Sequence, residues 1–454
     1  MKRKKILMVT ALFAASSIAL SACSTGKADV TTAATTAAET TAGETQAETT
    51  ATSASETTET EPSISETTFI SADDIKINDE ISSSEDSEHA IEVSNGSESY
   101  SNIKVTKTGD SDEGDKADFY GDNSAIFATD GAELTLTNII ADTDGKHANA
   151  VFSYGDGTTV TISDSVITTS GNCSGGLMTT GGGTTIATNL NIHTTGNSSA
   201  AIRSDRGGGT VIVTGGTYTT DGKGSPVIYS TADITVNDAV MESTSSQGIV
   251  IEGRNSVALN NVTLTADNNS KNSDKSSWYQ AVMIYQSMSG DAAEGTANFS
   301  MTGGSLTNIN GDIFFVNNTR AVITLTAAEI INLDPDGVFL RAAAAGWGKE
   351  GSNGGKVNLY LKDQTLEGDI IVDSISIVNM YLESGTVYTG AVNTDDEGEV
   401  CVTVESGSKW ILTGDSYISS LTCDAGAVDL NGYTLTVGGE VYNGGACSGT
   451  MADI

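Results

Sequence analysis

Three short apolar segments recur in the same order along the chain, once every 23 to 26 residues. The first segment of each repeat centres on one apolar residue, at Ile126, Val151, Leu177, Ile202, Ile228 and Ile251. A glycine-rich turn, a second segment and a third segment follow each of them. Apolar and polar residues alternate within the segments, which is typical of β-strands. Because strands that recur in one fixed order stack as coils, the repeat predicts a parallel β-helix rather than a sandwich of hairpins.

The residues between these strands suit the corners and the interior of such coils. The turn between the second and third strands carries residues that tolerate a left-handed backbone, namely Asn138, Asp164, Gly215, Asp238, Asn261 and Gly303. A column of small residues follows the third strand, at Thr169, Thr194, Thr220, Ser243 and Ala266. We expect this column to form a ladder inside the coils.

From about residue 90 to about residue 440 these segments resemble the right-handed parallel β-helix proteins of the pectate-lyase-like superfamily, which include lipoproteins and adhesins of bacterial surfaces. The resemblance implies an all-β fold, a single-stranded right-handed parallel β-helix of about twelve coils. It also implies a ligand groove over the first strand of the coils. It specifies no activity, because the superfamily holds lyases, hydrolases, carbohydrate-binding domains and adhesins.

The N-terminal part of the chain indicates export. Lys2-Arg3-Lys4-Lys5 precede an apolar run from Ile6 to Leu20, as in a signal peptide. The run ends in Leu-Ser-Ala-Cys, which resembles the bacterial lipobox, so that Cys23 would carry a diacylglycerol. We therefore expect a protein that is exported, lipid-anchored to the outer face of the bacterial cell membrane and exposed at the cell surface.

We divide the chain into five parts on this basis. Residues 1–22 are the signal peptide, and residues 23–70 are a disordered tether rich in Thr, Ala, Glu and Ser, which has too few large apolar residues to fold. Residues 71–122 form an N-terminal cap and the first coils, residues 123–400 the β-helix core, and residues 401–454 the last coils and a C-terminal cap. The exported part contains Cys173, Cys401, Cys423 and Cys447. Cys401 and Cys423 lie about one repeat apart, so they either form a disulfide between neighbouring coils or remain unbridged, and no spacing of Cys and His indicates zinc.

The charge and the composition of the chain limit the classes of molecule that it could bind. The chain has 59 acidic and 22 basic residues and a net charge of -37, which excludes nucleic acid as a partner, because phosphate recognition needs clustered Lys and Arg. Its 50 glycines and low aromatic content of 6% suit short strands with tight turns better than a conventional α/β enzyme. We expect the lipid anchor to be its only contact with the membrane, and an extracellular polysaccharide or a host or cell-wall glycan to be its partner.

The candidate binding site lies where the repeat lengthens. Insertions at residues 267–280, 287–296 and 342–355 border the face of the first strands. The residue after each inward-pointing anchor points outward, and we expect these residues to form one column: Phe127, Phe152, Met178, Arg203, Tyr229, Glu252, Tyr285, Asn317, Arg341 and Asp373. Aromatic rings stack on sugars and charged groups bind hydroxyls. The candidate glycan-binding residues are Arg203, Tyr229, Glu252, Arg254, Tyr285, Asn317, Arg341, Trp278 and Trp347. The alternative is that Phe127, Phe152 and Met178 lie under the N-terminal segment and that the other side chains form structural ladders.

Other functions remain open at this point. A Ca²⁺-dependent polysaccharide lyase would need clustered carboxylates and a base, but Asp205 and Glu252 lie about two coils, or roughly 10 Å, apart. The paired Asp and Gly-His-Gly motifs of polygalacturonases are absent. We therefore assign no catalytic residues, no metal ligands and no cofactor, although Ca²⁺ is possible at acidic clusters that otherwise are solvated turns, Asp110, Asp112, Asp115 and Asp118 or Asp334 and Asp336. An ice-binding face is not expected, because His193 and Glu242 interrupt the outward threonines. A purely structural surface stalk is the remaining alternative.

Overall fold

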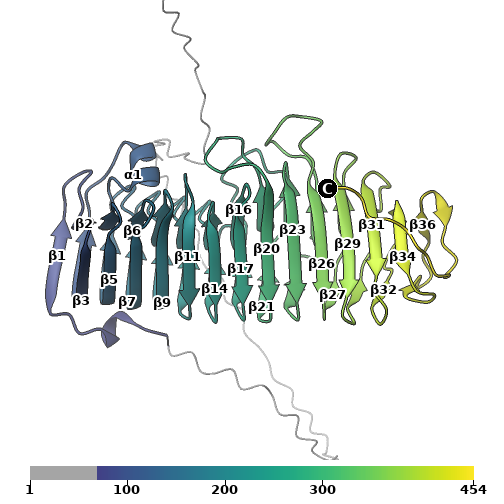
Figure 1. Ribbon diagram of the computed structural model, residues 1–454, viewed down its shortest axis with the longest axis horizontal. Helices are drawn as coiled ribbons and strands as arrows, with labels where there is room; N and C mark the ends of the chain where they lie inside the picture. The colour runs from purple at the N-terminus through teal and green to yellow at the C-terminus, as the bar shows by residue number, and fades with distance from the viewer. Residues whose placement is uncertain (1–68) are drawn as a thin grey trace, which may run out of the picture. The chain divides into compact units, whose positions relative to one another are not determined.

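Equivalent strands of successive coils pair in parallel in the computed structural model, which describes residues 69–454 (Figure 1). This confirms the predicted β-helix. The predicted signal peptide, Cys23 and the tether up to residue 68 lie outside the described residues. The described helices are η1 (Ala72–Asp74) and α1 (Gly114–Tyr120). No helix in residues 69–454 has the length and apolar character needed to cross a bilayer.

The first strands of the coils make an 11-stranded sheet. Its strands are β2 (Ile91–Ser94), β4 (Ile126–Thr129), β6 (Val151–Tyr154), β8 (Leu177–Thr180), β10 (Ile202–Ser204), β13 (Ile228–Ser230), β16 (Ile249–Glu252), β19 (Gln280–Tyr285), β22 (Asp312–Asn317), β25 (Leu340–Ala342) and β28 (Ile370–Val372). Figure 1 shows the coils lying side by side in chain order.

The second and third strands of the coils together make a 19-stranded sheet. Its strands are β1 (Asp79–Ser83), β3 (Ser97–Lys107), β5 (Glu133–Thr143), β7 (Thr159–Thr169), β9 (Gly183–Thr194), β11 (Gly209–Thr214), β12 (Thr217–Thr220), β14 (Asp233–Asn237), β15 (Val240–Ser243), β17 (Ser256–Asn260), β18 (Thr263–Ala266), β20 (Thr296–Thr302), β21 (Ser305–Asn308), β23 (Arg320–Thr326), β24 (Glu329–Asn332), β26 (Lys356–Lys362), β29 (Ile377–Glu383), β31 (Glu399–Val404) and β34 (Ser420–Cys423).

Two smaller sheets complete the C-terminal coils. One contains β27 (Thr365–Glu367), β30 (Val387–Thr389), β32 (Lys409–Ile411) and β35 (Val428–Asp429), and the other contains β33 (Ser416–Ile418), β36 (Leu435–Val437) and β37 (Glu440–Val441). The pairing of β36 with β37 is antiparallel, so the parallel stack ends there.

The predicted inward ladders are confirmed. Ile126, Val151, Leu177 and Ile202 lie opposite one another on successive coils and are buried. The small-residue column is also buried, and its hydroxyls bond within the corner: Thr169, Thr194 and Thr220 each donate to the carbonyl oxygen five residues later, at 2.5 to 2.6 Å. These bonds satisfy polar groups in an interior without water.

The predicted left-handed turn residues are confirmed as well. Asn138, Asp164, Asp238 and Asn261 have φ angles of 49° to 54°, and Gly215 and Gly303 are positive too. Their side chains bond from coil to coil, since the amide of Asn261 donates to Asp238 at 2.8 Å. The short polar side chain therefore allows the corner and links it to the next coil.

The register differs from the expected one after β13. Ile228 lies opposite Ile249 rather than Ile251, and Tyr229 lies opposite Val250. A shift of two residues keeps every side chain on its face but moves it to the neighbouring column. The single predicted outward column is therefore wrong: Arg203, Tyr229, Val250 and Met283 belong to one column, whereas Glu252, Tyr285 and Asn317 belong to the next.

On β9, Thr185 and Ala187 point inward and Ile186 is exposed. Of the two alternatives for Cys401 and Cys423, the one without a disulfide is confirmed. Cys401 lies opposite Ser420, Cys423 lies opposite Val404, and neither forms a disulfide.

Replacing Thr194 by Val tests the buried hydroxyl ladder. The variant keeps the shape of the side chain but leaves the carbonyl oxygen of Ser199 without its 2.5 Å bond. We expect a loss of about 1 to 3 kcal/mol in the free energy of unfolding, measured by denaturant titration. Thr188→Val on the exposed face of the same strand is the matched control and should change stability by less than about 0.5 kcal/mol. Equal effects of both substitutions would contradict the account.

Candidate functional site

Segments from distant parts of the chain enclose one cavity on the outer face of the first-strand sheet. Its walls include Asp118 of α1, Asn272 before β19, Asp291 after β19 and Trp347 after β25, and its volume is about 120 Å³. The prediction that the three insertions border the same face is therefore confirmed. The coils between them supply Arg203, Tyr229, Glu252 and Tyr285.

One end of this face is closed by the segment that carries α1. Phe127, Phe152 and Met178 form a buried cluster with Tyr154, and Tyr120 of α1 contacts the ring of Tyr154. The helix ends at Gly121 in a left-handed conformation, where a Cβ atom would lie 2.5 Å from the Phe127 ring. The alternative that these three residues lie under the N-terminal segment is thus confirmed.

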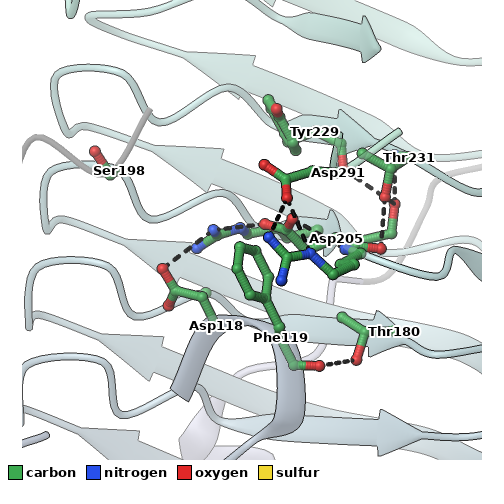
Figure 2. A network of polar contacts seen from close by, with 12 residues as sticks. Asp118, Phe119, Thr180, Ser198, Asp205, Tyr229, Thr231 and Asp291 are labelled. Atoms are coloured by element: carbon green, nitrogen blue, oxygen red, sulfur yellow. Dashed lines mark hydrogen bonds and ion pairs between the residues drawn. The ribbon is translucent and has the colours of Figure 1, made fainter. Parts of the chain in front are cut away.

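Charged groups meet at the boundary between α1 and the coils. Arg203 donates to Asp205 at 2.9 Å and lies 3.4 Å from Asp118, and Arg206 pairs with Asp291 at 2.6 Å. Figure 2 shows Asp118, Asp205 and Asp291 around these contacts, which are drawn as dashed lines. The Arg206 guanidinium also lies 4.0 Å from the centre of the Phe119 ring. Paired charges of this kind hold loop and helix onto the sheet.

The two carboxylates beside Arg203 differ in pKa. Burial, opposed by Arg203 but reinforced by Asp118, raises the pKa of Asp205 to about 7. Burial would also raise the pKa of Asp118, but Arg203 and His147 outweigh it and hold that pKa below its usual range. Of the two carboxylates beside Arg203, Asp118 is therefore ionised at neutral pH, whereas Asp205 exchanges its proton near neutral pH.

Glu252 is the centre of a second polar group. Its carboxylate accepts hydrogen bonds from the hydroxyls of Tyr229 at 2.5 Å and Tyr285 at 3.2 Å, and from the backbone N–H and hydroxyl of Ser287. Burial, and then Glu252, raise the pKa of both tyrosines well above the usual value. The phenols are therefore fixed donors to a buried carboxylate.

Aromatic side chains back this polar group. Trp347 packs edge-on against Tyr285, and Trp278 contacts Phe315 and lies 4.8 Å below the Arg341 guanidinium. Trp347 is only 5% exposed and Tyr285 is fully buried. The edge of one ring contacts the other ring, and the cavity is lined by both aromatic and polar side chains.

The nine predicted site residues divide into three groups. Arg203, Tyr229, Glu252, Tyr285 and Trp347 line the cavity. Trp278 lines a smaller neighbouring cavity of about 40 Å³, and Arg341 packs on it while paired with Asp312. Asn317 is buried and donates to backbone carbonyls, and Arg254 is exposed and does not line the cavity.

Sequence reasoning missed part of the lining. Asp118 was expected in a solvated turn, but it is 3% exposed, because α1 turns Ala117, Asp118 and Phe119 toward the sheet. Asp110, Asp112 and Asp115 of the same cluster are exposed, as expected. Ser287 and Asp291 lie in an insertion whose path no periodicity predicts. Among the described residues, one group of His, Cys and acidic side chains could hold a metal ion: Asp118, His147 and Cys173.

Comparisons with known proteins give partial matches. The chain is 28% identical over 155 residues to the autotransporter adhesin/invasin TibA of Escherichia coli O78:H11, covering 33% of this chain and 15% of that protein. It is also 28% identical over 137 residues to the autotransporter CRAC of Citrobacter rodentium, covering 30% of this chain and 8% of that protein. The matched part is thus a small share of these relatives' length. No protein-family model and no solved structure matches the chain.

The raised pKa of Asp205 predicts a pH dependence of stability. The folded state keeps a proton that the unfolded state releases between about pH 4 and pH 7, so this contribution falls as pH rises through that window and is constant above it. Asp205→Asn removes the titration. The stability of the wild type minus that of the variant should fall by up to about 1.4 kcal/mol per pH unit between about pH 5 and pH 7, measured by denaturant unfolding. A difference that does not change with pH would contradict the assignment.

Proposed function

We propose that the chain is a lipid-anchored surface adhesin that binds the end of an extracellular glycan in the cavity lined by Arg203, Tyr229 and Glu252. Regular coils form the scaffold, and each of the three irregular segments contributes to the lining of this cavity. Loops that depart from a repeat and gather at one place are typical of binding sites. A stalk without a ligand would have no need of them.

The main support for the proposal is a buried hydrogen-bond donor that has no partner. Nη1 of Arg203 is buried and has no hydrogen-bond partner in the described part of the chain, although Nη2 is paired with Asp205 and Asp118. A buried donor without a partner costs about 1 to 3 kcal/mol, so a ligand oxygen that reached it would recover this energy. Since Arg203 lines the cavity, the ligand oxygen would lie there.

The rest of the lining suits a sugar. The carboxylate of Glu252, the phenol of Tyr229 and the hydroxyl of Ser287 are groups that bind vicinal hydroxyls. The volume of about 120 Å³ is small beside the roughly 300 Å³ of an ordinary ligand pocket, which favours one terminal unit over a polymer running through the site. This revises the expected open groove to a pocket for a chain end.

Two independent observations support the proposed surface location and the proposed adhesive role of the protein. The lipobox-like segment at Cys23 and the Thr-rich tether supply an anchor and a spacer. The name of the partial relative from Escherichia coli describes an adhesin, and the present chain shares 28% identity with it over 155 residues. Surface adhesion is the role that unites the export segment, the β-helix and the cavity.

Replacing Glu252 by Gln tests the binding site. The side chain keeps its shape but loses the charge that accepts the hydroxyl groups, so we expect affinity for the best ligand of a glycan array to fall by roughly ten- to a hundredfold. Arg254→Gln is the matched control, because Arg254 is exposed outside the cavity, and its affinity should not change.

Three results would contradict the proposal. Failure of the full-length protein to bind any glycan would favour the stalk, and equal binding by the wild type and a folded Glu252→Gln variant would move the site elsewhere. Release of an unsaturated, ultraviolet-absorbing sugar product would show a lyase and overturn the non-catalytic assignment.

Replacing Cys23 by Ala tests the anchor. The variant lacks the thiol that would carry the lipid, so we expect no incorporation of labelled palmitate and release of most of the protein from the membrane fraction. Cys447→Ala should retain both the label and the membrane association. Membrane association of Cys23→Ala equal to that of the wild type would contradict a lipid anchor at this position.

A further inference from the structure

His147 and Cys173 occupy the same corner on neighbouring coils. Both have φ angles of 58°, and their backbone N–H groups donate to the carbonyl oxygens of Asn172 and Asn197, each one residue before the equivalent position on the next coil, at 2.9 and 2.8 Å. Equivalent residues of adjacent coils stack about 4.8 Å apart. The corner therefore places an imidazole directly beside a thiol, although the two residues are a full repeat apart in sequence.

Asp118 of α1 completes the group from above. Its Oδ1 lies 2.9 Å from Nδ1 of His147, and one ligand atom each of Asp118, His147 and Cys173 lie within 4.8 Å of one another. The three residues are 3%, 2% and 1% exposed. A carboxylate is costly to bury, and here it is held beside an imidazole and a thiol, two groups that bind transition metals.

We propose that Asp118, His147 and Cys173 bind one Zn²⁺ ion. Thiolate and imidazole are donors that zinc prefers, and a carboxylate is its third common ligand, whereas Ca²⁺ takes oxygen ligands only. The thiolate and the carboxylate together balance the two charges of the ion. This site adjoins the proposed glycan-binding cavity, because Asp118 and Cys173 line it, but metal binding does not require that a glycan binds there.

The geometry requires only a small contraction. Ligand atoms around tetrahedral zinc lie about 3.3 to 3.8 Å apart, and these atoms lie within 4.8 Å of one another, so their separations need to shorten by no more than about 1.5 Å. The three side chains come from separate segments, and rotation about their side-chain bonds can supply this movement. Gly114 leaves room beside the imidazole, because a Cβ atom there would lie 3.2 Å from Cε1 of His147.

Arg203 would hold the carboxylate ligand in position without binding the ion itself. It lies 3.4 Å from Oδ2 of Asp118, the oxygen that does not face His147, and metal-bound carboxylates are commonly held by such contacts. Its positive charge opposes a nearby cation, and Asp205, 2.9 Å away, offsets this charge when it is ionised. Asp118 and Cys173 line the cavity, so with three protein ligands the fourth position of the ion would open toward it.

Titration of the full-length protein in detergent with Co²⁺, a spectroscopic substitute for Zn²⁺, tests the site. We expect one equivalent to bind with a thiolate-to-cobalt charge-transfer absorption, and Zn²⁺ to displace it. Cys173→Ser should abolish the charge-transfer band, and Asp118→Asn should weaken binding at least about 100-fold, because removing a ligand costs more than the 10- to 100-fold of an outer partner. Arg203→Met should weaken binding by about 10- to 100-fold while keeping the band.

The double variant Cys423→Ser with Cys447→Ser is the matched control and should keep the full band, because these cysteines lie in the C-terminal coils. Circular dichroism verifies that each variant is folded. Absence of a band in the wild type, or a band that survives in folded Cys173→Ser, would overturn the proposal. Cys173→Ser changes one atom, so the test holds even if the larger change at Asp118 prevents folding.

Discussion

Backbone pairing between successive coils is the constraint on which the rest of this molecule depends. A single coil has no partner for its strand N–H and C=O groups and cannot bury its apolar side, so each coil is stable only against its neighbours. Ile126, Val151 and Leu177 show the result, because each lies directly opposite the next and none is accessible. A coil can therefore gain extra residues only at the corners between its strands, where an insertion breaks no strand pairing.

The candidate site follows from this freedom at the corners. Strands β16 and β19 pair in register although residues 267–279 are inserted between β18 and β19, and β25 and β28 pair although residues 343–355 are inserted after β25. These insertions border the same sheet at both ends of its strands and meet over the cavity. Asp291 would be costly to bury alone, but it is paired with Arg206, and the hydroxyl of Ser287 donates to Glu252.

Local rules predicted the coils, their corners and their inner ladder, because short-range patterns determine these features. Asn138, for example, occupies a turn because its short polar side chain tolerates the positive φ angle found there. Register after Tyr229 could not be predicted in this way, since Ile249 and Ile251 are equally apolar and both point inward. The contacts of Asp118 with His147 and Arg203 depend on how α1 lies across the coils, and no periodic signal describes that placement.

The central claim is that the converging segments form a glycan-binding pocket on a rigid scaffold. Hydrogen–deuterium exchange of the full-length protein, with and without a bound glycan, tests this most directly. The account predicts slower exchange with ligand at residues 198–206 and 286–291, which line the cavity, and no change along the outer strands of the 19-stranded sheet. Protection confined to that sheet or to the C-terminal coils would contradict it.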